Sequence, residues 1–201
     1  MGFKNREVEW KLLVDGHSSM ASVERAIYPL LSELNGGKVF AKATVVGCAS
    51  DTYWDVPEES QADFLRLRIL DEPDEGGNPA QITLKASDKG GNVNRVEVDL
   101  GVSDHVQANK LLTYLLGDPL GQVTKRYTVY FLEDVHTTIS VYKVMKDKRI
   151  FVEVEATTLK RVKEMTKTLV EKGGLKVERI PQSLFDMFVQ KKIMTPEPVQ
   201  F

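Results

Sequence analysis

Three charged side chains stand at alternate positions near the start of the chain: Glu7, Glu9 and Lys11. In an extended strand, alternate side chains point to the same face, so these three would share one face. Two carboxylates and an ammonium group could together hold a divalent cation and a phosphate, because hard cations prefer oxygen ligands and often bind substrate phosphates. If this stretch stood alone, a solvent-exposed strand face would be the better explanation.

The same alternation of ionisable and apolar residues recurs in three later strand-like runs, at 66–68, 95–99 and 153–155. Four charged strand faces favour one shared charged surface. If that surface turns inward, its charges need water, mutual pairing, metal ions or a charged ligand, because burying an unpaired charge is very costly. We therefore expect a charged tunnel rather than a dry core.

Acidic and basic side chains suit different parts of such a ligand. Paired carboxylates suit Mg²⁺ or Mn²⁺, whereas lysine and arginine suit phosphate oxygens, and arginine can donate two parallel hydrogen bonds. The acid pairs are Glu7 with Glu9 and Glu153 with Glu155. The candidate phosphate-binding cations are Lys11, Arg66, Arg68, Lys85, Arg95 and Arg126.

Composition narrows the class of protein. The 201 residues, 42% hydrophobic, predict a single globular domain over 1–201, with a flexible proline-rich tail at about 194–201. The 27 Lys and Arg against 29 Asp and Glu give a net charge of −2, so the chain lacks the basic bias of a general nucleic-acid binder. One cysteine, Cys48, and no long apolar run at the amino terminus predict a cytoplasmic protein without a membrane span.

The periodicity of apolar residues predicts an α+β fold. Strands are expected at about 7–12, 38–55, 64–70, 80–86 and 93–100, with three more between 122 and 156. Helices are expected at about 18–34, 103–117, 158–173 and 183–191. The short connections favour antiparallel pairing, and about eight strands are enough to close a barrel.

In their joint order, these segments resemble a CYTH domain of the triphosphate tunnel metalloenzyme family, whose relatives include class IV adenylate cyclases, thiamine triphosphatases and inorganic triphosphatases. The Glu-x-Glu-x-Lys signature of the family stands here as Glu7, Glu9 and Lys11. Further matching segments are 51–55, 65–68, 83–85, 95–97, 125–126, 151–155 and 181–184. The resemblance implies an eight-stranded antiparallel β-barrel tunnel with helices packed outside, which binds a triphosphate with Mg²⁺ or Mn²⁺.

The resemblance also implies roles for individual residues. The implied metal ligands are Glu7, Glu9, Glu97, Glu153 and Glu155. The implied phosphate-binding residues are Lys11, Arg66, Arg68, Lys85, Arg95, Lys125 and Arg126, and Lys125 either assists or faces outward. The implied catalytic residues are Glu9, Lys85, Arg66 and Arg68. One departure is that an acid which many relatives carry before the last Glu-x-Glu has no clear counterpart within 142–151.

The expected function is metal-dependent hydrolysis of inorganic tripolyphosphate or of a nucleoside or other organic triphosphate. Two alternatives stay open: a class IV-type adenylate cyclase, which makes cyclic AMP and pyrophosphate from ATP, and a non-catalytic protein that binds triphosphate or polyphosphate. The expected partner is a small-molecule triphosphate, with nucleic acid only as a 5′-triphosphate RNA end. Monomer and homodimer are both compatible with the sequence.

Overall fold

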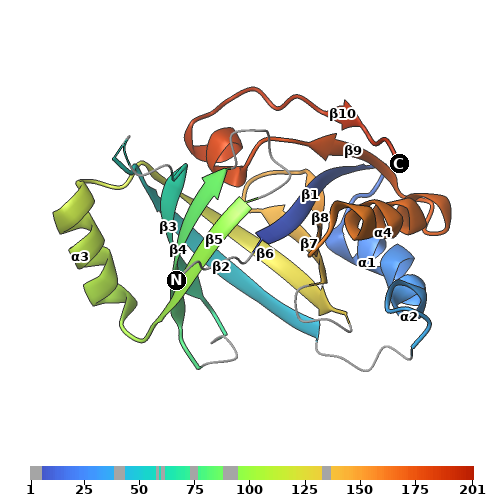
Figure 1. Cartoon of the computed structure of the whole chain (residues 1–201), viewed down its shortest axis with the longest axis horizontal. Helices are drawn as coiled ribbons and strands as arrows, with labels where there is room; N and C mark the ends of the chain where they lie inside the picture. Colours follow the sequence, from blue (N-terminus) through green and yellow to red (C-terminus); the bar gives the residue numbers. More distant parts are fainter. Residues whose placement is uncertain are drawn as a thin grey trace. The chain divides into compact units, whose positions relative to one another are not determined.

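The structure, a computed structural model, describes residues 6–38, 44–57, 59, 62–72, 77–87, 95–132 and 137–201. Within these residues the chain forms ten strands and four α-helices (Figure 1). The chain divides into two compact units, and the grouping of both into a single domain stays a prediction. Unit 1 takes its described residues from Arg6, Gly47–Lys125 and Gln182–Ile193, and unit 2 takes them from Glu7–Val46, Arg126–Pro181 and Met194–Phe201.

Unit 1 is built around an antiparallel sheet in the order β5-β4-β3-β2, in which consecutive strands are neighbours. Its strands are β2 (Thr44–Trp54, in this unit from Gly47), β3 (Phe64–Leu70), β4 (Ala80–Ser87) and β5 (Arg95–Val102), followed by the first half of β6 (Gly121–Phe131). The helical elements are α3 (His105–Leu116) and the π-helical turn η3 (Phe185–Val189). Asp104 caps α3 by accepting hydrogen bonds from the backbone N–H groups of Val106 and Gln107.

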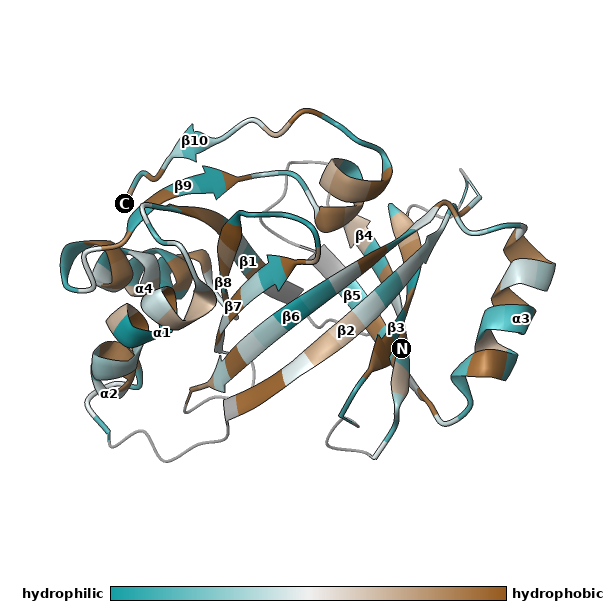
Figure 2. Ribbon diagram, turned by 180° about the vertical axis from the view of Figure 1, so that it is seen from behind, coloured by the Kyte–Doolittle hydropathy of each residue, from teal (hydrophilic) through white to brown (hydrophobic). Residues whose placement is uncertain are grey.

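The two faces of this sheet differ in polarity. On one face, Trp54, Leu67 and Ala80 pack against Ala108 and Leu112 of α3. Figure 2 shows hydrophobic and hydrophilic bands that alternate along this helix. Because alternate strand residues point to opposite faces, this packing leaves the charged positions of β2 to β5 on the other face.

Unit 2 is organised around β1 (Arg6–Asp15), which pairs antiparallel with β8 (Ile150–Ala156) and also with β9 (Lys176–Ile180), as Figure 1 shows. The remaining strands are β7 (Thr138–Val144), β10 (Glu197–Pro198) and the second half of β6. The helical elements are α1 (Met20–Ile27), the 3₁₀ turn η1 (Tyr28–Leu30), α2 (Leu31–Leu34) and α4 (Leu159–Glu171). α4 buries Val162, Met165 and Leu169, which recur at helical spacing.

The antiparallel sheets with helices outside them confirm the predicted fold class. The number of strands differs, because the described residues form ten strands where the sequence predicted eight. The two additional strands, β9 and β10, are short, and β10 arises in the tail that was expected to be flexible. There Glu197 pairs with Arg179 both in strand register and by an ion pair of 3.7 Å. Closure of eight strands into one barrel stays a prediction.

One predicted helix is interrupted. The segment expected to be helical through 34 instead forms α1, η1 and α2, with Pro29 in the middle. Proline has no N–H to donate within a helix, which accounts for the break. Among the described residues, no helix combines the length and apolar composition needed to cross a membrane.

The packing of α3 predicts different effects for two adjacent leucines. Leu112 is buried in the cluster with Trp54 and Leu67, whereas Leu111 is 56% exposed. We expect Leu112→Ala to lower the free energy of unfolding by about 2–4 kcal/mol, because it removes buried methyl groups and leaves a cavity. Leu111→Ala should change it by less than about 0.5 kcal/mol. Urea denaturation of both variants measures the difference, and equal losses would contradict this packing.

Candidate functional site

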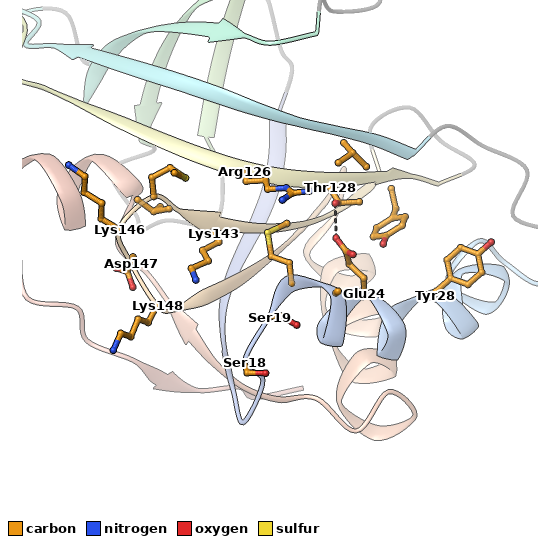
Figure 3. A pocket seen from close by; sticks show the side chains of 16 residues that line it. Ser18, Ser19, Glu24, Tyr28, Arg126, Thr128, Lys143, Lys146, Asp147 and Lys148 are labelled. Atoms are coloured by element: carbon orange, nitrogen blue, oxygen red, sulfur yellow. Dashed lines mark hydrogen bonds between the residues drawn. The ribbon is translucent and has the colours of Figure 1, made fainter.

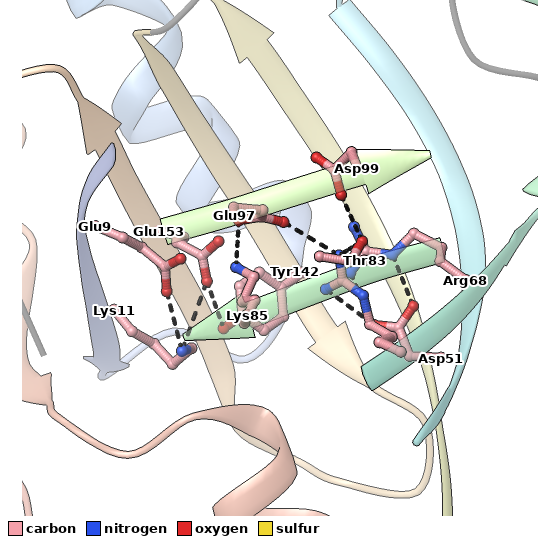
Figure 4. A network of polar contacts seen from close by, with 11 residues as sticks. Glu9, Lys11, Asp51, Arg68, Thr83, Lys85, Glu97, Asp99, Tyr142 and Glu153 are labelled. Carbon is pink, nitrogen blue, oxygen red and sulfur yellow. Dashed lines mark hydrogen bonds and ion pairs between the residues drawn. The ribbon is translucent and has the colours of Figure 1, made fainter. Parts of the chain in front are cut away.

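Asp51 is the fully buried acid of a charged cluster in unit 1, which Figure 4 shows. It lies opposite Arg68 in the β2–β3 register, and Arg68 donates two hydrogen bonds to its carboxylate, Nε to Oδ1 at 2.7 Å and Nη2 to Oδ2 at 2.8 Å. Arg66 adds a longer ion pair of 3.9 Å. Burial alone would raise the pKa of Asp51, but the charges of Arg68 and Arg66 hold that pKa well below its usual range.

Arg66 differs from Arg68 in having an unused donor. Its Nη2 donates to Thr83 Oγ1 at 2.8 Å and lies 3.5 Å from Glu97 Oε1. Its Nε is buried and has no hydrogen-bond partner. An unpaired buried donor carries a desolvation penalty of about 1–3 kcal/mol, so an added acceptor oxygen would be favourable at this position.

The rest of the cluster comes from β4 and β5, which are neighbouring strands of the same sheet. Lys85 and Glu97 are opposite in register, and their Nζ and Oε2 atoms form an ion pair of 2.8 Å. Thr83 donates to Asp99 Oδ1 at 2.6 Å. Partial burial, together with the charge of Glu97, raises the pKa of Asp99. Unit 1 therefore brings together the predicted residues Arg66, Arg68, Lys85 and Glu97.

A second charged cluster lies between β1 and β8 in unit 2. Lys11, which is 5% exposed, places its Nζ 3.3 Å from Glu9 Oε1 and 3.8 Å from Glu153 Oε2 (Figure 4). Tyr142 on β7 donates its hydroxyl to the same Glu153 oxygen at 3.3 Å. Glu155 stands opposite Glu9 in register and accepts a 3.5 Å hydrogen bond from Thr138. The predicted residues Glu9, Lys11 and Glu153 are thus in contact.

These carboxylates are suitable donors for a hard divalent cation. Among the described residues, no group of three or more His, Cys, Asp or Glu side chains is placed to hold a metal ion. Two carboxylates nevertheless converge on one positive charge, the ammonium group of Lys11. Mg²⁺ is usually held by only one or two carboxylates together with waters and substrate phosphates. The donor set therefore fits such an ion, with the remaining ligands coming from outside the protein.

Two predicted side chains lie outside the described part of the structure. The backbones of Glu7 and Arg95 belong to β1 and β5, but their side chains are not described. Their implied roles, as a metal ligand and a phosphate-binding residue, stay predictions.

Lys125 and Arg126 are adjacent residues on β6, so their side chains point to opposite faces of the strand. The charge of Lys125 contributes to the low pKa of Asp51. Arg126 is exposed and lines a pocket of about 820 Å³ in unit 2, beside the hydrogen bond from Thr128 to Glu24 (Figure 3). The structure thus places Lys125 near the buried acid, while Arg126 belongs to this pocket.

The same pocket contains Asp147, the acid nearest to the last Glu-x-Glu. Arg149 donates to both of its carboxylate oxygens, and these hydrogen bonds hold the pKa of Asp147 below its usual value. Asp147 is therefore engaged in the turn between β7 and β8.

Sequence reasoning did not assign Asp51, Thr83, Asp99 and Tyr142 to the site. Two of them alternate with residues that it did assign, since Thr83 precedes Lys85 by two and Asp99 follows Glu97 by two. Asp51 has no assigned residue at the neighbouring alternate positions of β2, and its place opposite Arg68 comes from the strand register. Extending the charged face of β4 by one alternate position would have found Thr83, and the charged run 95–99 already contained Asp99. Tyr142 carries no such signal, because its neighbours on β7 are apolar or small.

One comparison with known proteins identifies a family, and a second shows the fold. A family model described as a CYTH domain matches residues 5–181. A protein of solved structure from Pyrococcus horikoshii OT3 is similar at 24% identity and a TM-score of 0.65, over 90% of this chain and 98% of that one. A protein from Hippeastrum, proposed to be an adenylyl cyclase and reported to have a dominant triphosphatase activity, is similar at 18% identity and a TM-score of 0.64, over 93% and 97%. A search of curated proteins found no match.

The ion pairs of Asp51 predict a specific dependence of stability on pH. Because the pKa of Asp51 is lower in the folded than in the unfolded protein, its stabilisation is complete above the unfolded pKa of about 3.9 and is lost as the pH falls below it. We expect Asp51→Asn to lower the free energy of unfolding by about 3–5 kcal/mol at pH 7, since it breaks buried ion pairs.

Urea denaturation between pH 7 and pH 3 tests this expectation. The difference between Asp51→Asn and the original protein should shrink below about pH 4, where the stabilisation from the original carboxylate begins to be lost. Asp118→Asn, at an exposed acid of the same unit, is the control and should leave the profile unchanged. A difference that stays constant down to pH 3 would contradict the assigned pairing.

Proposed function

Because the chain belongs to the CYTH domain family, we propose that it is a divalent-metal-dependent triphosphatase. Its substrate would be inorganic tripolyphosphate or a nucleoside or other organic triphosphate. The observation that carries the proposal is the buried, unpartnered Nε of Arg66, which lies in a cluster with Arg68 and Lys85. A buried guanidinium donor without an acceptor requires an explanation, and an anion oxygen that reaches it when the substrate binds would supply one.

Within this cluster, the two arginines would have different roles. Arg68 uses two donors on Asp51, so it is held in place and contributes mainly its charge. Arg66 would bind a phosphate oxygen through Nε, and Lys85 would exchange part of its pairing with Glu97 for phosphate. Such fixed positive groups stabilise the negative charge on a transferring phosphoryl group.

The carboxylates of unit 2 would hold the metal ion. Glu9 and Glu153 are the central ligands in this proposal, and Glu155 stands opposite Glu9 in register. Glu7 of the same unit, and Glu97 of unit 1, stay predicted ligands. When bound, Mg²⁺ or Mn²⁺ would neutralise phosphate charge and polarise the phosphoryl group towards attack by water. The fit of carboxylate oxygens to a hard cation supports this assignment.

The reported triphosphatase activity of the similar Hippeastrum protein supports hydrolysis over cyclisation. The alternatives are cyclisation of ATP, in which a ribose hydroxyl attacks and pyrophosphate leaves, and binding of a triphosphate or polyphosphate without reaction. A 5′-triphosphate RNA end is a further substrate that a phosphate-binding cluster could accept. We also propose that the protein is cytoplasmic and that it is a monomer or a homodimer.

Product analysis distinguishes these functions. The protein is offered tripolyphosphate, ATP, thiamine triphosphate and triphosphate-ended RNA separately, with Mg²⁺ or Mn²⁺, and every product is identified. We expect orthophosphate and the corresponding diphosphate. Cyclic AMP and pyrophosphate would establish the cyclase instead, and tight binding without any product would establish the binding protein.

Removal of Lys85 should abolish most of this activity. We expect Lys85→Met to reduce kcat/KM by about 10²-fold, because one electrostatic contact to the transition state contributes roughly 3 kcal/mol. Lys110→Met, at an exposed position of α3, is the matched control and should leave kcat/KM unchanged. Circular dichroism checks that both variants are folded. Near-normal turnover by folded Lys85→Met would remove Lys85 from the site.

Because Lys125 and Arg126 lie on opposite faces of β6, we expect their substitutions to affect kcat/KM to different extents. We expect Lys125→Met to reduce kcat/KM by about tenfold, since it removes a positive charge close enough to Asp51 to affect its pKa. Arg126→Met should change kcat/KM by less than about twofold, because Arg126 lines the pocket beside α1. Steady-state kinetics on the preferred triphosphate measure both, and the reverse order would favour Arg126 over Lys125 as a phosphate-binding residue.

A further inference from the structure

We propose that Lys11 is an internal cation that competes with the metal ion for Glu9 and Glu153, so that the metal ion and the triphosphate bind cooperatively. The triphosphate would remove the ammonium group from the carboxylates and so make them available. The inference rests on the proposed function in one respect, which is that a triphosphate is the ligand of this site. It concerns how the binding of the metal ion and the binding of the triphosphate depend on each other, which does not follow from membership of the family.

The starting observation is the position of the Lys11 ammonium group. Its Nζ is 3.3 Å from Glu9 Oε1 and 3.8 Å from Glu153 Oε2, and the side chain is almost completely buried. The two carboxylates belong to different strands, β1 and β8, yet both face this one charge. An ammonium group in this position neutralises the acids in the same way as a bound metal ion would.

A metal ion and this ammonium group cannot both occupy the space between the carboxylates. Two positive charges a few ångströms apart repel each other strongly where water is largely excluded. Lys11 also occupies one oxygen of each carboxylate, Glu9 Oε1 and Glu153 Oε2. Metal binding in the absence of a triphosphate therefore has to displace Lys11 from these carboxylates with no phosphate to receive its charge, which is unfavourable.

A triphosphate changes this balance because it provides Lys11 with a new anionic partner. The four-carbon stem of lysine is flexible, and its ammonium group can point in several directions from the same backbone position. When the ammonium group turns to a phosphate oxygen, Glu9 and Glu153 lose the positive charge that stood between them. Their negative charges then attract the metal ion, and the phosphate oxygens complete its ligands.

Tyr142 keeps one of these carboxylates in place during the exchange. Its hydroxyl donates to Glu153 Oε2, the same oxygen that Lys11 approaches, and the ring is buried and stacked on Phe151. The Tyr142 hydrogen bond does not depend on Lys11. Glu153 is therefore already oriented when the ammonium group leaves, so little reorganisation is needed before it binds a metal ion.

The test measures Mn²⁺ affinity by isothermal titration calorimetry, first with Mn²⁺ alone and then with diimidotriphosphate, whose P–N–P bridges resist hydrolysis. We expect Lys11→Met to bind Mn²⁺ alone at least about fivefold more tightly than the original protein, because the competing cation is gone. Lys11→Arg keeps a competing cation and should stay close to the original affinity. In thermal denaturation, Mn²⁺ alone should raise the Tm of Lys11→Met more than that of the original protein.

The linkage itself gives a second readout. Diimidotriphosphate should increase the Mn²⁺ affinity of the original protein by a larger factor than it increases the Mn²⁺ affinity of Lys11→Met. In each protein, Mn²⁺ should increase the affinity for diimidotriphosphate by the same factor as diimidotriphosphate increases the affinity for Mn²⁺. A folded Lys11→Met with unchanged Mn²⁺ affinity would overturn the proposal, even if the original protein hydrolyses triphosphates. Tighter Mn²⁺ binding by Lys11→Met in a protein that hydrolyses none of the substrates would support the competition and contradict only the hydrolysis.

Discussion

A charge that leaves water must find an opposite charge within the protein, and this constraint governs both clusters of the structure. Asp51 is fully buried and is stable as a carboxylate only because Arg68 and Arg66 surround it. Lys11 is buried because Glu9 and Glu153 face it. Each cluster contains both signs, so a sheet face can be highly charged in a protein whose net charge is only −2.

The same constraint determines how such a surface can bind a ligand. An anion that enters unit 1 meets cations that already have carboxylate partners, and it must compete with those partners. Arg68 makes a two-point contact with Asp51 and is the hardest to release, whereas Arg66 has a buried donor to spare. The internal acids thus distinguish the neighbouring arginines, because Asp51 holds Arg68 at two points whereas Arg66 keeps one donor without a partner.

Strand alternation made much of this arrangement predictable. Because the period of a strand is two residues, alternation placed Arg66 and Arg68 on one face of the sheet. It placed the apolar residues that pack against α3 on the other face. Strand pairing was not predictable, since register depends on packing between distant segments. For that reason the pairing of Asp51 with Arg68 emerged only from the structure.

Lys125 and Arg126 are consecutive cations, so the residue type gives no indication of which one lies near Asp51. β10 has only two residues and contains Pro198, so its pattern is too short to be recognised as a strand.

The contact of Glu9 and Glu153 with Lys11 has a consequence for any metal ion bound there. Asp147 is held by Arg149, and Tyr142 orients Glu153 with a hydroxyl group, which is a much weaker ligand for Mg²⁺ than a carboxylate. A site with many carboxylates would bind a divalent cation on its own and would not need the substrate to retain it. A site in which two carboxylates converge on a lysine has to obtain its remaining ligands from phosphate and water. Because Lys11 contacts both Glu9 and Glu153, retention of the metal ion at these two carboxylates would depend on the triphosphate.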